Sequence, residues 1–200
     1  MKKKILVLAS GMGSNFAAIR EHIRKKKLKA EISALISDNP ESNSLLLALS
    51  FKIDSVCIPY RKEDREGYNR DLLRKIRQYD PDLIVTAGYM KILPEFIVNE
   101  YVHRIINIHP SLLPAFPGIN SIHKAYSYGS QISGCTTHFV DNTVDGGPII
   151  LQSAVKIKNG MSETDLTEVI HKEEHKILPL SVQYFIEDRI QIEGRRITIL

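Results

Sequence analysis

The chain has 200 residues, 43% of them hydrophobic and 25% charged, and a formal net charge of +4. These values suit one globular domain with a substantial core and exclude a low-complexity chain. No segment approaches the roughly 20 apolar residues that a membrane-spanning helix needs.

The opening residues Met1 to Ser10 resemble the start of a signal peptide, but their apolar run ends at Gly11 and is too short for that role. A buried first strand explains them better. The basic run Lys25–Lys29 has no interleaved aromatic residues, so we interpret it as a solvated helix end and not as a nucleic-acid site. Cys57 and Cys135 show no paired spacing and are expected to be reduced. We expect a cytoplasmic protein that binds neither membrane nor nucleic acid.

Short apolar runs alternate with helical periodicity along the first half of the chain. The predicted elements are, in order, strand Lys4–Leu8, helix Asn15–Lys27, strand Glu31–Ser37, helix Ser42–Phe51, strand Ser55–Ile58, helix Asp64–Tyr79 and strand Leu83–Ala87. In the second half they are helix Pro94–Val98, strand Ile105–Ile108, helix Ile122–Tyr128, strands Cys135–Val140 and Ile149–Val155, and helix Ser162–Asp188.

This alternation predicts an α/β fold: a single domain with a mainly parallel, twisted, Rossmann-like sheet covered by helices. The segment from Gly134 to Val155 departs from it, because two strand patterns flank the turn at Asp141–Gly147. We expect an antiparallel excursion at the edge of the sheet.

A glycine-rich segment, Gly11-Met-Gly-Ser-Asn15, separates the first strand from the first helix. Backbone N–H groups at such a helix start attract an anion such as phosphate. The segment lacks the third glycine of a dinucleotide fingerprint and the Gly-Lys-Ser/Thr of a Walker loop. The alternative is a simple turn in which Ser14 or Asn15 caps the helix.

The strand Ile105–Ile108 runs into His109-Pro-Ser-Leu-Leu-Pro114 and carries Asn107 and His109 at spacing i, i+2, which places both side chains on one face. His109 suits proton transfer, and Asn107 supplies an N–H donor for a developing oxyanion. Asp145, in a glycine-rich turn, could approach the strand end and raise the pKa of His109. The set suits acyl transfer without a covalent enzyme intermediate. The alternative is a capping Asn, a satisfied His and a turn Asp. His138 could face either the core or this site.

A rival of a different class lies at His171-Lys-Glu-Glu-His175, which matches the H-x-x-E-H pattern of a zinc hydrolase with two imidazoles on one helical face. No third ligand is identifiable, and Pro179 is expected to end the helical turn soon after. Our main prediction includes no metal.

Taken together, these motifs resemble the phosphoribosylglycinamide (glycinamide ribonucleotide) formyltransferase family of purine biosynthesis, over essentially the whole chain. The resemblance is carried by Gly11-Met-Gly-Ser-Asn15, Ala87-Gly-Tyr-Met-Lys-Ile-Leu93, Asn107-Ile-His-Pro-Ser-Leu-Leu-Pro114, Thr137-His-Phe-Val140 and Asp145-Gly-Gly-Pro-Ile149. The Asn107–Pro114 motif is shared by the wider superfamily that uses 10-formyltetrahydrofolate. It therefore indicates formyl transfer but not which molecule receives the formyl group. The signal for that molecule is the glycine-rich loop Gly11–Asn15.

The resemblance implies transfer of a formyl group from the co-substrate 10-formyltetrahydrofolate to the glycinamide amine. It assigns phosphate binding to residues 1–100 and folate binding and catalysis to residues 101–200. The catalytic residues would be Asn107, His109 and Asp145, with a cis peptide before Pro114. Other implied positions are, for the substrate, Gly11, Met12, Gly13, Ser14, Asn15 and Glu174, and, for the folate, Arg65, Met90, Lys91, Ile92, Leu93 and Asn107. We expect only small-molecule partners and a monomer or homodimer.

The chain departs from the family pattern in places. Met12 stands where Asn is common, which is tolerable if backbone N–H groups bind the phosphate. After Gly118, the segment Ile119-Asn-Ser-Ile122 replaces a Leu-His-x-His pattern, and Ala115 replaces a common basic residue.

Two rivals remain within the superfamily. Methionyl-tRNA formyltransferases carry a C-terminal nucleic-acid-binding domain, for which we expect no room. Formyltetrahydrofolate hydrolases usually add an N-terminal domain, whereas here the first predicted strand begins at Lys4. A hydrolase, or a formyltransferase with another acceptor, stays the main alternative.

Overall fold

The computed structural model describes residues 2–200, so Met1 lies outside the described residues. The chain divides into two compact units: an N-terminal unit up to Ile106 and a C-terminal unit from Asn107 to Leu200. The elements of the N-terminal unit are β1 (Lys3–Leu8), α1 (Ser14–Arg24), β2 (Ala30–Ser37), α2 (Asn43–Ser50), β3 (Ser55–Cys57), α3 (Arg65–Tyr79), β4 (Leu83–Thr86) and α4 (Glu95–Glu100).

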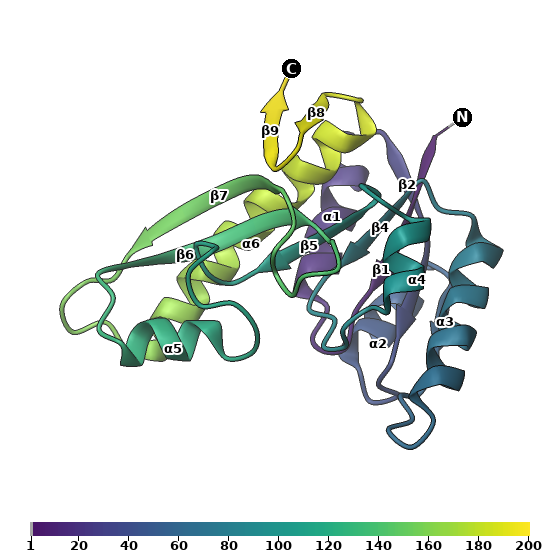
Figure 1. Ribbon diagram of the computed structural model, residues 1–200, viewed down its shortest axis with the longest axis horizontal. Helices are drawn as coiled ribbons and strands as arrows, with labels where there is room; N and C mark the ends of the chain where they lie inside the picture. Colours follow the sequence, from purple (N-terminus) through teal and green to yellow (C-terminus); the bar gives the residue numbers. More distant parts are fainter. Residues whose placement is uncertain (1) are drawn as a thin grey trace. The chain divides into compact units, whose positions relative to one another are not determined.

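The strand β5 (Ile105–His109) begins in the N-terminal unit and ends in the C-terminal unit. The remaining elements are α5 (Ser121–Ser127), β6 (Ile132–Phe139), β7 (Ile149–Lys156), α6 (Glu163–Ile186), β8 (Ile190–Glu193) and β9 (Arg196–Ile199). Figure 1 shows them in chain order by colour.

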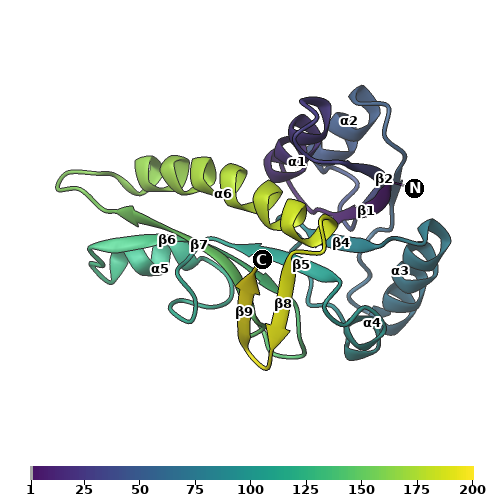
Figure 2. The ribbon, with the colours of Figure 1, turned by 90° about the horizontal axis from the view of Figure 1, so that it is seen from above.

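The N-terminal unit is built on parallel strands. β1 pairs in parallel with both β2 and β4, and β2 pairs in parallel with β3. Helices α1 and α2 cover one face of these strands and α3 and α4 the other (Figure 2). With helices on both faces, the strands need apolar side chains in both directions, and Ile5 to Leu8 are indeed fully buried.

The C-terminal unit is built on an antiparallel pair. β6 and β7 pair along their length, from Ile132 opposite Lys156 to His138 opposite Ile149. The long helix α6 packs alongside both strands, as Figure 2 shows. The helix begins with a capping box, in which Ser162 and Asp165 each bind the other's backbone N–H. Its apolar side, with Leu166, Ile170 and Val182, is fully buried.

The strand order of the seven-stranded sheet is β3-β2-β1-β4-β5-β6-β7, and β8 and β9 form a separate hairpin. The expected α/β fold, with a mainly parallel sheet and an antiparallel excursion, is therefore confirmed. Every helix within residues 2–200 is too short or too polar to cross a bilayer.

Several expectations about local structure were wrong. The hairpin β8–β9 was not predicted, although Ile190, Ile192, Ile197 and Ile199 alternate with polar residues around Gly194. Pro179 does not end the helical turn but lies buried inside α6, so the helix predicted over Ser162–Asp188 continues through it to Ile186.

The start and end of the first helix also differ from expectation. Gly13 is its N-cap and makes no side-chain cap bond, so neither Ser14 nor Asn15 caps the helix. The helix ends at Arg24, and most of the basic run Lys25–Lys29 follows it in a turn.

Candidate active site

The end of β5 carries the two polar residues that the sequence singled out. His109 is buried and Asn107 half-buried. The turn after them is tied to β6 by the buried hydroxyl of Thr136, which donates to the Ser111 carbonyl at 2.7 Å and accepts from the Leu113 N–H at 3.1 Å. The peptide bond between Leu113 and Pro114 is cis, as the resemblance implied. The strand end is thus held in a defined place.

The loop between β6 and β7 presents Asp145. The Thr143 N–H donates to the Asp141 carboxylate at 2.8 Å, and the Gly146 N–H donates to the Thr143 carbonyl at 3.1 Å. Asp145 has a φ of 51°, a left-handed conformation that aspartate adopts more readily than most residues. Gly147 is required by close packing, since a Cβ there would lie 1.8 Å from the Phe139 carbonyl oxygen. The sequence Asp-Gly-Gly therefore fits this tight loop.

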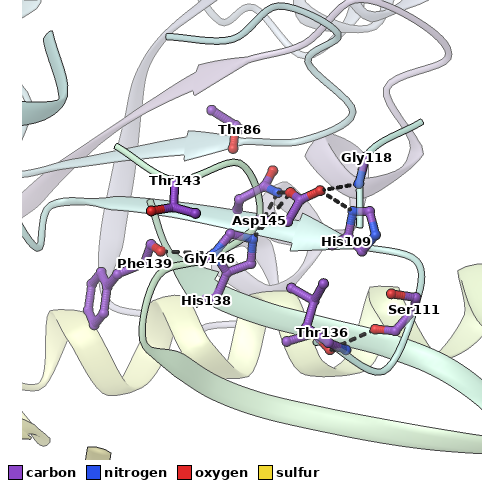
Figure 3. A network of polar contacts seen from close by, with 12 residues as sticks. Thr86, His109, Ser111, Gly118, Thr136, His138, Phe139, Thr143, Asp145 and Gly146 are labelled. Carbon is purple, nitrogen blue, oxygen red and sulfur yellow. Dashed lines mark hydrogen bonds and ion pairs between the residues drawn. The ribbon is translucent and has the colours of Figure 1, made fainter. Parts of the chain in front are cut away.

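The Asp145 carboxylate is the centre of the polar network in Figure 3. Its Oδ2 lies 3.3 Å from Nδ1 of His109 and accepts a hydrogen bond from the Gly118 N–H at 2.7 Å. Its Oδ1 accepts from Nδ2 of Asn107 at 3.5 Å. The C-terminal unit therefore brings together Asn107, His109 and Asp145, the residues predicted to be catalytic.

His138 completes this network from β6. Its Nδ1 lies 2.8 Å from the carbonyl oxygen of Phe139, so we assign the hydrogen to Nδ1. In the neutral ring, Nε2 is then an acceptor, and Nδ2 of Asn107 donates to it at 3.1 Å. The same Nε2 lies 3.7 Å from Oδ1 of Asp145. His138 thus fixes which way the Asn107 amide points.

Both ring nitrogens of His109 face acceptors. Nε2 lies 3.0 Å from the Phe116 carbonyl oxygen and therefore carries a hydrogen, while Nδ1 faces the Asp145 carboxylate. A neutral ring would place the Nδ1 lone pair against that carboxylate, so this contact favours a proton on Nδ1.

Burial disfavours the protonated form of His109, which the contact with Asp145 favours. Desolvation lowers the pKa of His109 below its ordinary value and outweighs the Phe116 carbonyl and the Asp145 charge, which both raise it. Asp145 therefore raises the pKa of His109, as expected, but desolvation has the larger effect and the net pKa is lowered. Burial by itself would raise the pKa of Asp145, but the Gly118 N–H and His109 lower it, so the carboxylate stays ionised.

The predicted phosphate loop, Gly11–Asn15, lies in the N-terminal unit between β1 and α1. Its carbonyl oxygens are engaged from the start of α2. Gly11 accepts from the Ser44 N–H at 3.1 Å and from the Ser42 hydroxyl at 2.8 Å, and Met12 accepts from the Asn43 amide at 2.9 Å. The first N–H groups of α1 have no intrahelical acceptors, which is the arrangement that attracts an anion.

Gly13 is needed for this loop geometry. Its φ is 76°, and a Cβ there would lie 2.9 Å from the Cα of Ser44. Met12, by contrast, is 74% exposed, so its side chain does not shape the loop.

The predicted folate residues, apart from Asn107, lie in the N-terminal unit and so outside the half, residues 101–200, to which folate binding was assigned. The segment Met90–Leu93 follows β4 and is anchored by Ser10, whose Oγ accepts from the Met90 N–H at 2.8 Å. Lys91 lies 3.6 Å from the buried Asp38 carboxylate and 4.2 Å above the Tyr60 ring. Apolar Met90 and Ile92 are exposed, whereas Leu93 is buried. Arg65 is exposed at the first turn of α3.

The helix α6 carries the remaining predicted residues. Glu174 is buried at 4% exposure, while the neighbouring Glu173 accepts from the Ser153 hydroxyl at 2.8 Å. His171 and His175 share this helix, and burial lowers the pKa of His175. Within residues 2–200, no three His, Cys, Asp or Glu side chains are grouped so that they could hold a metal ion.

Sequence reasoning missed the supporting residues of the site. The Gly118 N–H and the Thr136 hydroxyl carry no sequence signal, because their roles arise only when distant segments meet. For His138 the sequence favoured neither the core nor the site, and the structure places it at the site, where it contacts Asn107.

Comparisons with known proteins identify the family of this chain. Residues 3–182 match the family model described as formyl transferase. The chain is 38% identical over 189 residues to phosphoribosylglycinamide formyltransferase of Escherichia coli K12, covering 94% of this chain and 89% of the relative. The crystal structure of glycinamide ribonucleotide transformylase 1 from Symbiobacterium toebii superposes with a TM-score of 0.96 at 38% identity, covering 100% of this chain and 94% of that one.

A formyltetrahydrofolate deformylase from Pseudomonas syringae pv. tomato is also similar in structure, with a TM-score of 0.95. Its identity is lower, at 27%, and the match covers 100% of this chain but 66% of that one. The length of the family match and the identity to the Escherichia coli relative make the assignment plain: this chain belongs to the formyl transferase family.

Proposed function

We propose that the chain transfers the formyl group of 10-formyltetrahydrofolate to the amine of 5'-phosphoribosylglycinamide. The products are formylglycinamide ribonucleotide and tetrahydrofolate, in de novo purine biosynthesis. The proposal rests mainly on one observation: Asn107 and His109 both contact the Asp145 carboxylate. The names of the Escherichia coli and Symbiobacterium toebii relatives support the choice of acceptor.

In the proposed reaction the neutral amine attacks the formyl carbon, and a new C–N bond forms as the carbonyl oxygen becomes an oxyanion. Asn107 would donate an N–H to that oxyanion, which would take the place of Oδ1 of Asp145, the acceptor now 3.5 Å from Nδ2. His109 would donate from Nε2, with the oxyanion taking the place of the Phe116 carbonyl oxygen that now accepts this bond.

The intermediate then collapses by breaking the bond between the formyl carbon and N10 of the folate. The amine loses one proton and N10 gains one. Asp145 would accept the amine proton, directly or through a water molecule, and protonated His109 would supply a proton to the leaving N10. Asp145 would then return its proton to His109, whose Nδ1 lies 3.3 Å from Oδ2, which restores both groups. The lowered pKa of Asp145 keeps its carboxylate ionised, so that it can accept a proton from the amine.

The substrate-binding roles belong to the same proposal. The backbone N–H groups of Gly11–Asn15 would bind the ribose phosphate, and Glu174 would help to hold the glycinamide substrate. Arg65 and the segment Met90–Leu93, together with Asn107, would contact the folate. The exposure of Met90 and Ile92 supports this, because both side chains are available to an apolar ligand surface. The cytoplasmic location and the monomeric or homodimeric state stay predictions.

A hydrolase is the second candidate, and the similarity to the Pseudomonas syringae deformylase favours it over a formyltransferase that uses a different acceptor. In that case water would take the place of the amine. The two functions therefore differ in whether folate is released without an acceptor.

The test is a formyl-transfer assay with purified protein, 10-formyltetrahydrofolate and phosphoribosylglycinamide, following tetrahydrofolate release and formylglycinamide product together. We expect equal amounts of both products, and no folate release without the acceptor. Folate release at the same rate in the absence of acceptor would instead identify a hydrolase.

A further inference from the structure

The C-terminal hairpin reaches the loop that carries Asp145. Nη2 of Arg195, in the turn between β8 and β9, lies 2.5 Å from the carbonyl oxygen of Gly146 and donates a hydrogen bond to it. Strands β7 and β9 are also in contact. Both partners belong to the C-terminal unit, and Gly146 directly follows Asp145 in the chain.

The hairpin holds Arg195 in a defined place. Ile190 pairs with Ile199 and Ile192 with Ile197, so four half-buried isoleucines share one face while the alternate residues are exposed. Gly194 has a φ of 60°, the sign that a two-residue type II′ turn needs at its first central position. The Leu200 N–H donates to the Arg189 carbonyl at 2.9 Å and closes the open end.

The backbone restraints within the Asp145 loop lie on either side of Asp145. Its first part is held by the Thr143 and Gly146 turns, and its end by Gly147 against Phe139. Asp145 itself is in the left-handed region, which non-glycine residues keep only where the surroundings hold them. The Gly146 carbonyl is the backbone acceptor next to this residue, so a bond there restrains the peptide that sets the direction of the carboxylate.

We infer that Arg195 is a positioning residue, which holds the Asp145 loop so that the carboxylate meets His109 and the Gly118 N–H. This inference rests on the proposed function, since it treats Asp145 as the proton acceptor. Misplacing a catalytic group by about 1 Å can cost a factor on the order of 100 in rate. Because the Arg195 side chain is exposed and water can replace part of its bond, we expect a loss of roughly tenfold.

The test compares Arg195→Met with Arg196→Met. Both residues are exposed and adjacent on the hairpin, but Arg196 lies in β9 opposite Glu193, on the exposed face of the strand. We expect Arg195→Met to lower kcat about tenfold with little change in the KM for either substrate, and Arg195→Lys to recover part of it. Arg196→Met should keep wild-type values.

A second readout does not depend on activity. Amide hydrogen exchange of Gly118 and Gly146 should become faster in Arg195→Met, because the acceptor of the Gly118 N–H is Asp145 and Gly146 lies in the loop. Exchange in α6 should be unchanged, which separates loosening of the loop from general destabilisation.

The outcomes separate this inference from the proposed function. Wild-type kcat and wild-type exchange in Arg195→Met would overturn the positioning role, as would an equal loss in Arg196→Met. Full activity in Asp145→Asn would instead overturn the catalytic assignment. In that event the exchange measurement still shows whether Arg195 orders the loop.

Discussion

The Gly11–Asn15 loop and the Asp141–Gly147 loop are both glycine-rich connections, but they present different groups to a ligand. The first is held through its carbonyl oxygens by Ser42, Asn43 and Ser44, and it presents backbone N–H groups. The second presents one side chain, the Asp145 carboxylate, whose neighbours come from β5, β6 and the segment at Gly118. A site made of backbone N–H groups should keep its binding when side chains in the loop are changed. A site made of one side chain should lose its geometry when any residue that holds that side chain is changed.

The largest expected effect lies at the side-chain site. Asn107→Ala removes an N–H donor for the oxyanion, and we expect kcat to fall about 100- to 1000-fold, or about 2.7–4 kcal/mol of barrier. The fold should survive, because Asn107 is only half-buried. Steady-state kinetics and circular dichroism would test this. Turnover close to wild type in the folded variant would remove Asn107 from the mechanism.

The next effect concerns the backbone site, and Ser14→Asp tests it. Asp at the first turn of α1 suits the helix dipole by about 0.3–1 kcal/mol, so thermal stability should not fall. The same charge repels a phosphate at the helix start, and we expect the KM for phosphoribosylglycinamide to rise at least about tenfold at low ionic strength. Ser14→Asn is the uncharged control. An unchanged KM in Ser14→Asp would indicate that the loop is only a turn.

A third prediction uses the opposed effects on His109. Burial lowers its pKa while the Asp145 charge raises it, so Asp145→Asn should lower the pKa further. Because the folded state then binds a proton less readily than the unfolded state, this residue's contribution to stability is present above its unfolded pKa. This stability is lost as the pH falls below the unfolded pKa towards the lowered pKa of the folded state. The loss is larger in Asp145→Asn, because its folded pKa is lower still.

Titration of the His109 ring by NMR would measure this shift. Asp141→Asn, in the same loop, is the control, because its side chain can still accept from the Thr143 N–H. A His109 pKa that rises in Asp145→Asn would show that the carboxylate does not act on this ring as the geometry indicates.

The smallest effect is expected at Met12. Met12 is exposed, and Met12→Asn should change kcat and KM by less than about threefold if backbone N–H groups bind the phosphate. Parallel kinetics on the two proteins would suffice. A larger gain in affinity would mean that the side chain at this position takes part in binding.

Much of the fold could be predicted because its signals are local. The buried part of a strand such as β1, Ile5 to Leu8, is a continuous apolar run, and helices such as α3 begin at a capping Asp64 and end before Asp80-Pro81. The errors came where tertiary contacts outweigh local preference. Pro179 stays inside α6 because its neighbours are buried, and β8–β9 is too short for its alternation to stand out.

By itself, the sequence determined the α/β class, the glycine loop before α1, and the common face of Asn107 and His109, because all three follow from residue spacing along the chain. Only the tertiary structure decided that His138 orients Asn107, that Gly118 and Arg195 restrain the Asp145 loop, and that burial lowers the pKa of His109. Desolvation and long-range hydrogen bonds depend on which distant segments meet, and residue spacing does not contain that information.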